Sequence, residues 1–204
     1  MSIKKNIVYG VTGTIASGKT FLCTQLALIA HQEKIPLHVI QVDEIRRYIL
    51  NESWEKKHIH IRSALAAHNV SSKNIFEKEE YMKTFQHYIN PEIKAIIQEQ
   101  LDHLDGIVLL ERAMLLFDGM EDFVDGIVFV SCSPEAQKER LLHADLWPIE
   151  IEKRICYQNK QKIYPTQEVV QKKNWIVFDT SHAPSYEEYH MLFKKINNGY
   201  AQKK

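Results

Sequence analysis

Cysteine, charge of one sign and long apolar runs are all scarce in this chain of 204 residues, and each scarcity excludes a class of protein. The three cysteines, Cys23, Cys132 and Cys156, are odd in number and scattered, which excludes a disulfide framework and a cysteine-based metal site. Lysine plus arginine and aspartate plus glutamate both total 26, so the basic excess of a dedicated nucleic-acid-binding protein is missing. No apolar stretch approaches the roughly 20 residues of a membrane helix, and the N-terminus is not a secretory signal. We therefore expect a cytoplasmic protein with reduced thiols that binds neither nucleic acid nor membrane.

Glycine is also rare, with seven residues in the chain, but two of them frame one short motif. Residues 13–20 match the pattern G-x-x-x-x-G-K-[S/T] in full, between the apolar run Ile7–Val11 and an apolar segment that opens a helix. The main-chain N–H groups of such a loop and the start of the helix attract phosphate oxygens. Lys19 would reach the β- and γ-phosphates, and the Thr20 hydroxyl would bind Mg²⁺. The motif predicts a nucleoside-triphosphate site formed by Gly13, Thr14, Ile15, Ala16, Ser17, Gly18, Lys19, Thr20 and Phe21.

Short apolar runs rich in β-branched residues recur along the chain and alternate with segments of helical spacing. These runs are Ile7–Val11, Leu37–Ile40, Ile107–Leu110, Ile127–Val130 and Trp175–Phe178. Hydrophobicity that is continuous along each run is typical of strands covered on both faces. The pattern predicts an α/β fold of about five parallel strands flanked by helices, with the site at the carboxyl ends of the strands. We expect Cys132 to lie in the apolar strand formed by the fourth run, as a buried structural thiol.

A helical block separates the second run from the third. The interval from Asp43 to Leu104 holds no strand-like run, and Glu79–Leu104 in particular has helical spacing. Pro91 falls inside that segment and should kink or divide its helix. We expect this block, at about residues 43–104, to bind the acceptor of a small P-loop kinase.

Two further helices are expected after the fourth run. Ser133 and Pro134 suit a helix cap and a first helical position, which predicts a helix that reaches about Leu142. A second helix at about 149–162 would complete a lid, at about 144–163, that closes over the triphosphate. The segments at about 3–42, 105–143 and 173–199 would then form the core of a single domain over residues 1–204.

Two acidic residues follow strand-like runs at the edge where the glycine loop should lie. Phosphoryl transfer to a hydroxyl needs a carboxylate that takes the hydroxyl proton, and Asp43, after the second run, is the candidate base and partner of metal-bound water. The alternative is that Asp43 only caps the helix that follows. Glu111 ends the third run, where an acid can contact Mg²⁺, and the alternative is a surface acid at a strand end.

Positive side chains near the expected lid could neutralise charge on the transferring phosphoryl group. The candidates are Arg140, Lys153 and Arg154, although arginines on amphipathic helices are commonly only solvated. A magnesium site takes oxygen ligands and needs none of the ten histidines. His58 and His60 lie in a charged segment that we expect to be exposed.

With these residues in place, the chain resembles the dephospho-CoA kinases, the enzymes of the last step of coenzyme A synthesis. The glycine loop matches the opening motif of the family, and residues 39–47 match its Val-Ile-Asp-Ala-Asp-x-Ile-Ala-Arg run. Asp43 keeps the second aspartate of that run, which is the proposed catalytic base, and Gln41 replaces the first. Residues 133–140 match the Ser-Pro-Glu-x-Gln-x-x-Arg run through Arg140, and Gln158 matches a glutamine of the second lid helix.

Two other family motifs are present with changed residues. Residues 90–93 match His-Pro-x-Ile with Asn90 in first place, and residues 114–118 match Pro-Leu-Leu-Phe-Glu with Met114 first and Asp118 last. An arginine of the lid is replaced by Ala144. These departures leave two alternatives open, a nucleoside or nucleotide kinase on the same scaffold and a nucleotide-binding regulator with impaired catalysis.

The resemblance spans residues 7 to about 185 and implies a P-loop kinase fold. It also implies ATP-dependent phosphorylation of a small molecule, the 3′-hydroxyl of dephospho-CoA, with ATP and Mg²⁺ as cofactors. The implied catalytic residues are Asp43, Lys19 and Arg140, the acceptor contacts are Arg46, Asn90 and Gln158, and the metal contacts are Thr20 and Glu111.

Overall fold

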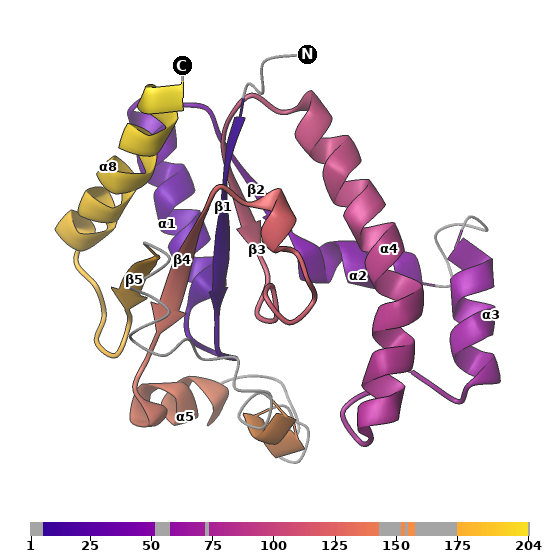
Figure 1. The fold of residues 1–204 in the computed structure, drawn as a ribbon. Coiled ribbons are helices and arrows are strands. Elements are labelled where there is room, and N and C mark those ends of the chain that lie inside the picture. Colours follow the sequence, from indigo (N-terminus) through magenta and orange to yellow (C-terminus); the bar gives the residue numbers. More distant parts are fainter. Residues whose placement is uncertain are drawn as a thin grey trace.

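Figure 1 shows the computed structural model of the chain, which describes residues 6–51, 58–71, 74–142, 152–153, 155–157 and 175–203. A parallel sheet of five strands stands at its centre. The strands are β1 (Asn6–Gly13), β2 (Leu37–Gln41), β3 (Gly106–Glu111), β4 (Gly126–Ser131) and β5 (Ile176–Asp179). Their order across the sheet is β2-β3-β1-β4-β5, so β1 lies in the middle. All five predicted strands and their parallel arrangement are confirmed.

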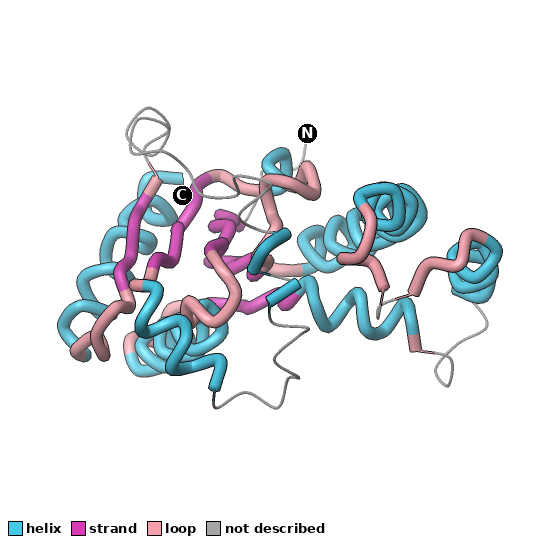
Figure 2. Tube along the Cα trace, turned by 90° about the horizontal axis from the view of Figure 1, so that it is seen from below, coloured by secondary structure: helices cyan, strands magenta, loops and turns pink. Residues whose placement is uncertain are grey.

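Helices cover both faces of the sheet (Figures 1 and 2). They are α1 (Lys19–Gln32), α2 (Val42–Leu50), α3 (Ile59–Ala67), α4 (Glu79–His103), α5 (Pro134–Leu142) and α8 (Tyr186–Lys203), with a 3₁₀ turn at Glu121–Phe123. Successive side chains of a strand point to opposite faces. On β3, Ile107 and Leu109 accordingly belong to the apolar cluster of α1 and α8, whereas Val108 and Leu110 belong to the cluster of α2, α4 and, beyond α4, α3. The sheet therefore divides the core into two apolar layers.

Helix α4 is a single helix of 25 residues, and the predicted division at Pro91 is wrong. Proline removes one main-chain hydrogen bond from a helix interior, which costs about 3 kcal/mol in an unsupported helix. Here both halves of α4 bury apolar side chains in the same layer, including Ile89 before the proline and Ile93 after it, both fully buried. Because packing holds each half against the same neighbours, the helix continues through the missing bond.

The start of α5 confirms the predicted cap. The main-chain N–H of Ala136 donates to Ser133 Oγ at 3.2 Å, and Pro134 is the first helical residue. The expected lid lies mostly outside the described residues, together with Ala144, Arg154 and Gln158. Residues 152–153 and 155–157 are described and are helical. No helix within the described ranges has both the length and the hydropathy of a bilayer-spanning segment.

Two sequence-based expectations about single residues are wrong. His58 is buried, with 1% of its surface exposed, and its Nδ1 lies 3.4 Å from Glu92 Oε1 on α4, whereas His60 is exposed as expected. Cys132 is partly exposed because it follows β4 instead of lying inside it. The burial of His58 depends on its contact with a distant segment, which local patterning does not report.

Candidate active site

The loop between β1 and α1 depends on its two glycines. Gly13 has φ +150°, and a Cβ at this position would come within 2.2 Å of the Val130 carbonyl oxygen on β4. Gly18 has φ +87°, in the left-handed region, directly before the first residue of α1. Glycine adopts this conformation without steric cost. The loop can therefore turn sharply against β4 and present the start of α1 at the carboxyl edge of the sheet.

Lys19 lies inside this loop. Its side chain is buried, and Nζ donates to the Thr14 carbonyl oxygen at 2.6 Å. Burial lowers the pKa of Lys19, while the nearby carboxylates of Glu111 and Asp43 act in the opposite direction without reversing the shift. The loop ammonium and the two acidic candidates therefore share one electrostatic environment.

Thr20 and Glu111 meet directly. Val11 of β1 pairs with Glu111 of β3, so the sheet register sets the end of β3 beside the loop. Thr20 Oγ1 donates to Glu111 Oε1 at 2.6 Å. Glu111 Oε2 is buried and has no hydrogen-bond partner within the described part of the chain. A hydroxyl and a carboxylate with a free, buried oxygen are the hard donors that Mg²⁺ prefers.

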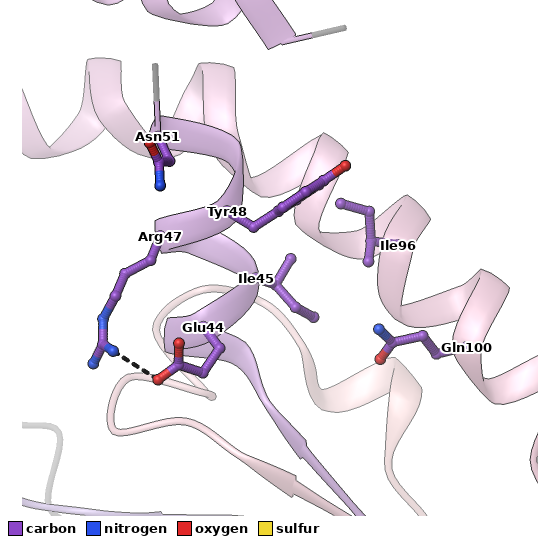
Figure 3. Close-up of a pocket in the computed structure, with 7 residues that line it drawn as sticks. All are labelled: Glu44, Ile45, Arg47, Tyr48, Asn51, Ile96 and Gln100. Carbon is purple, nitrogen blue, oxygen red and sulfur yellow. Dashed lines mark hydrogen bonds and ion pairs between the residues drawn. The ribbon is translucent and has the colours of Figure 1, made fainter. Parts of the chain in front are cut away.

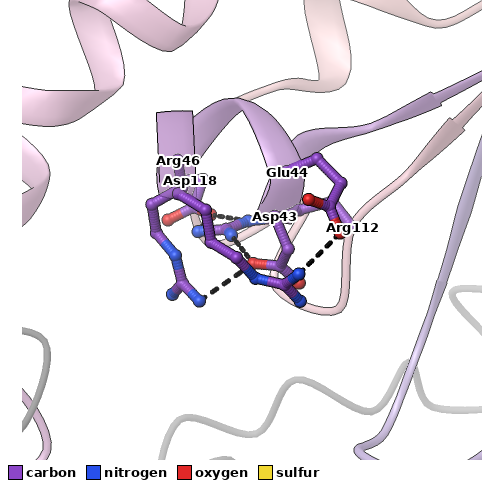
Figure 4. Close-up of polar contacts among 6 residues, drawn as sticks. Asp43, Glu44, Arg46, Arg112 and Asp118 are labelled. Carbon is purple, nitrogen blue, oxygen red and sulfur yellow. Dashed lines mark hydrogen bonds and ion pairs between the residues drawn. The ribbon is translucent and has the colours of Figure 1, made fainter. Parts of the chain in front are cut away.

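Asp43 lies in the first turn of α2, at the same edge of the sheet. The residue before this helix is Gln41, and no side chain caps the helix, so the capping alternative for Asp43 is wrong. Its Oδ1 accepts a hydrogen bond from Arg112 Nη1 at 2.6 Å and lies 3.3 Å from Arg46 Nη2 (Figure 4). Burial acts to raise the pKa of Asp43, but Arg112, Arg46 and Lys19 together lower it. Asp43 is therefore a carboxylate at neutral pH.

Arg112 is the functional candidate that the sequence analysis missed. Its side chain is only 7% exposed, and it donates to Asp43 on one side and to Asp118 Oδ2 on the other, with Nε at 2.7 Å (Figure 4). Asp118 is buried as well, and its Oδ1 accepts a hydrogen bond from Gln86 of α4 at 2.8 Å. An arginine directly after an apolar strand, with no acid beside it except Glu111, was the available signal, since a buried charge needs a partner.

Helix α5 holds the other side of the loop. Gln137 Nε2 donates to the Ile15 carbonyl at 2.8 Å, and Arg140 Nη1 donates to the Ala16 carbonyl at 3.2 Å. Arg140 also donates to the Thr180 hydroxyl at 3.1 Å and to its carbonyl oxygen. The Thr180 hydroxyl donates in turn to the Ser17 carbonyl at 2.7 Å. Arg140 thus lies against the loop between β1 and α1.

Known proteins match the chain along most of its length. A family model described as dephospho-CoA kinase matches residues 7–177. The chain belongs to the dephospho-CoA kinase family. The dephospho-CoA kinase of Synechococcus elongatus is 26% identical over 162 residues, which are 73% of this chain and 75% of that one. The enzyme of the same name from Thermus thermophilus is 22% identical over 189 residues, 90% of this chain and 88% of that one.

Solved structures confirm the fold. The crystal structure of TT1252 from Thermus thermophilus superposes with a TM-score of 0.61 at 20% identity, over 96% of this chain and 98% of that one. Shikimate kinase from Acinetobacter baumannii, in complex with shikimate, superposes with a TM-score of 0.54 at 13% identity, over 97% and 96%. As a dephospho-CoA kinase family member with a P-loop kinase fold, the chain is an ATP-using phosphotransferase for a small molecule.

Three residues that the resemblance to dephospho-CoA kinases named as acceptor contacts have different outcomes. Arg46 lies at Asp43, as described above. Asn90 is half-buried on α4, and its side chain makes no hydrogen bond to any other described residue. Gln158 lies outside the described residues. Lys153 does not meet the loop, because its Nζ pairs with Glu77 at 3.0 Å.

A cavity of about 570 Å³ lies between α2 and α4 (Figure 3). Apolar side chains of Ile45, Tyr48 and Ile96 line it, with the Glu44–Arg47 ion pair at its border. Neither Asp43 nor Arg46 is among its lining residues. A second cavity of about 490 Å³ is lined by Gly18, Phe21 and Arg140, so it opens beside the phosphate loop. The candidate active site is therefore formed by Asp43, Glu111 and the loop between β1 and α1, and not by the cavity between α2 and α4.

Proposed function

We propose that this chain transfers the γ-phosphoryl group of ATP to the 3′-hydroxyl of dephospho-CoA, with Asp43 as the general base. Family membership supports the reaction. The residue roles rest on one observation: Lys19, Glu111 and Asp43 lie at one edge of the sheet. Both carboxylates are near enough there to favour the charged form of Lys19. Phosphoryl transfer is catalysed mainly by positioning and by charge stabilisation, and this cluster supplies both.

The loop would hold the triphosphate. Its main-chain N–H groups and the start of α1 would bind phosphate oxygens, and Lys19 would exchange its bond to the Thr14 carbonyl for the β- and γ-phosphates. Arg140 lies against the loop and lines the cavity of about 490 Å³ together with Phe21, Tyr186 and Tyr189. Aromatic side chains suit a nucleoside base. In this proposal Arg140 neutralises charge on the transferring phosphoryl group, and the cavity binds the nucleoside of ATP.

Thr20 and Glu111 would hold Mg²⁺. The fit rests on the free, buried Oε2 of Glu111 and on the Thr20 hydroxyl beside it. When bound, the ion neutralises charge on the β- and γ-phosphates. Within the described ranges no cluster of three or more histidine, cysteine or acidic side chains offers a rival metal site.

The acceptor would approach from the side of α2 and α4. Asp43, ionised at neutral pH, would take the proton of the acceptor hydroxyl. Arg46 and Asn90 would contact the acceptor, with Gln158 reaching it from the lid. We propose the block at about 43–104 as the acceptor-binding region and the segment at about 144–163 as the lid, within one domain.

A coupled assay across candidate acceptors tests the reaction. We expect ATP-dependent ADP release with dephospho-CoA, and the formation of coenzyme A by mass spectrometry. Nucleosides and nucleoside monophosphates are the comparison acceptors. If turnover occurs only with a nucleoside or a nucleoside monophosphate, that compound and not dephospho-CoA is the acceptor. ATP binding without turnover on any acceptor would instead identify a nucleotide-binding regulator.

A further inference from the structure

Arg112 joins three elements that are far apart in the sequence. It follows β3, and its main-chain N–H donates to the Val11 carbonyl of β1 at 3.0 Å. Its guanidinium reaches Asp43 on α2 and Asp118 in the segment after β3. Asp118 is tied to α4 through Gln86. A continuous chain of hydrogen bonds therefore runs from α4 to the candidate base.

Burial makes this chain of contacts rigid. The side chains of Arg112 and Asp118 are 7% and 1% exposed, so neither charge can exchange its partner for water. Arg112 directs Nε and Nη2 to Asp118 Oδ2, both at 2.7 Å. The planar guanidinium then has a fixed direction for Nη1, which points to Asp43. Asp43 is the partner that adapts, since its side chain is 44% exposed.

The two oxygens of Asp43 are not equivalent. Oδ1 accepts the hydrogen bond from Arg112 at 2.6 Å and has Arg46 at 3.3 Å. Across the part of the chain that the structure describes, Oδ2 accepts no hydrogen bond. Arg112 therefore fixes one oxygen and leaves the other available to the acceptor.

We propose that Arg112 is a positioning residue for phosphoryl transfer, which anchors Oδ1 of Asp43 so that Oδ2 faces the acceptor hydroxyl. This inference rests on the proposed function, in which Asp43 is the base. In the step, the hydroxyl proton moves to Oδ2 and the hydroxyl oxygen forms a bond to the γ-phosphorus. The bond from that phosphorus to the β,γ-bridging oxygen breaks, and ADP leaves with the electron pair. Asp118 and Gln86 act only by holding Arg112.

The pH dependence of kcat/KM for dephospho-CoA tests this role. In the wild-type chain, the acid limb should have its midpoint below the ordinary aspartate pKa, because the positive neighbours hold the pKa of Asp43 down. Arg112→Gln should move this acid limb to higher pH and lower kcat by about 10²-fold, the scale of a misplaced catalytic group. KM for ATP should change little, since Arg112 makes no contact with the phosphate loop's side chains within the described residues.

Two further variants separate positioning from a structural role. Arg112→Lys keeps the positive charge but loses the planar guanidinium that contacts both acids at once. Its acid limb should therefore stay low, while its kcat should lie between those of Arg112→Gln and wild type. Asp118→Asn keeps Arg112 and removes the acid that balances it, so its acid limb should stay at or below the wild-type position. A shift of both acid limbs to higher pH would instead indicate general damage to the fold. Lys83→Gln on α4, which removes a surface pair with Glu79 at 2.9 Å, is the control and should match wild type.

A measurement without turnover keeps the two proposals apart. The carboxyl carbon of Asp43 is titrated by ¹³C NMR in wild type and in the Arg112 variants, and is assigned by its loss in Asp43→Asn. An upward shift of its pKa in Arg112→Gln, but not in Arg112→Lys, supports the inference even if dephospho-CoA is not the acceptor. An unchanged titration in Arg112→Gln, or wild-type kcat in Arg112→Lys, overturns it. Should Arg112→Gln not fold, the kcat of Arg112→Lys and the pKa of Asp43 in Asp118→Asn decide: wild-type kcat in the first, or a raised pKa in the second, overturns the inference.

Discussion

Lys19 and Arg112 are both buried cations, but their pKa values shift in opposite directions. Burial lowers the pKa of Lys19, and the lowered pKa survives the carboxylates of Glu111 and Asp43. Burial also acts against the charge of Arg112, but Asp118 and Asp43 raise its pKa above the ordinary value. The charges of Asp118 and Asp43 are the larger cause of the raised Arg112 pKa, and the hydrogen bonds to both acids add to it, whereas Lys19 donates to a neutral carbonyl. Of these two cations, Lys19 is thus the one whose charged form an incoming anion would stabilise more.

Asp43→Asn should lower kcat by about 10²–10⁴-fold while ATP binding is kept, because the amide cannot take the hydroxyl proton. The change is isosteric, and the new side-chain amide would still accept the Arg112 bond through its carbonyl oxygen. Steady-state kinetics and calorimetric titration with a non-hydrolysable ATP analogue measure the two effects separately. A variant with near wild-type turnover would remove Asp43 from the role of base.

Helix α5 links a local sequence signal to the site. Its Ser133 cap places Gln137 one turn in and Arg140 two turns in, and both donate to carbonyl groups of the phosphate loop. A cap that contributes to the stability of α5 therefore also supports the loop.

Ser133→Ala should lower the free energy of unfolding by about 0.5–2 kcal/mol, because the Ala136 N–H loses its acceptor. Urea denaturation monitored by circular dichroism gives the change in midpoint at constant slope. The matched control is Ser63→Ala, an exposed serine inside α3, where we expect a change within about 0.5 kcal/mol. Equal midpoints for the two variants would show that the cap contributes nothing.

Local patterns predicted most elements, and the failures have physical causes. The five strands and the start of α5 follow from apolar runs and from cap chemistry, which act over a few residues. A division of the helix at Pro91 and an exposed His58 were wrongly predicted, because both outcomes depend on packing along α4. There, Ile89 and Ile93 hold the helix together, and Glu92 lies beside the buried imidazole.

The strand order explains why the site forms where it does. With β1 between β3 and β4, its carboxyl end has Glu111 on one side and the segment leading to α5 on the other. The crossover from β1 through α1 to the edge strand β2 then brings α2 and Asp43 to the same edge, two strands away. Nucleotide and acceptor sites can therefore lie side by side over one sheet.

Because the two sites share one edge of the sheet, we expect nucleotide and acceptor to bind to the folded chain at the same time. A non-hydrolysable ATP analogue with Mg²⁺ at about 100 times its Kd should stabilise the fold by about 2.7 kcal/mol, and raise Tm by about 5–11 °C. Dephospho-CoA should raise Tm further in the presence of the analogue, and differential scanning fluorimetry measures both shifts. Lys19→Met is the comparison variant and should lose most of the nucleotide shift. An analogue that leaves Tm of the wild-type chain unchanged would contradict nucleotide binding at this loop.

The turn formed by the glycine loop and the five strands could be read directly from the sequence, because glycine conformation, apolar runs and capping are properties of neighbouring positions. The partners of the acidic residues could not be read in this way. Asp43, Arg112 and Asp118 are brought together by a helical crossover and a buried segment, and Gln86 joins them from a third element. Such contacts arise only when the sheet order and the packing of α4 are set, since the free energy that selects them is shared among residues far apart along the chain.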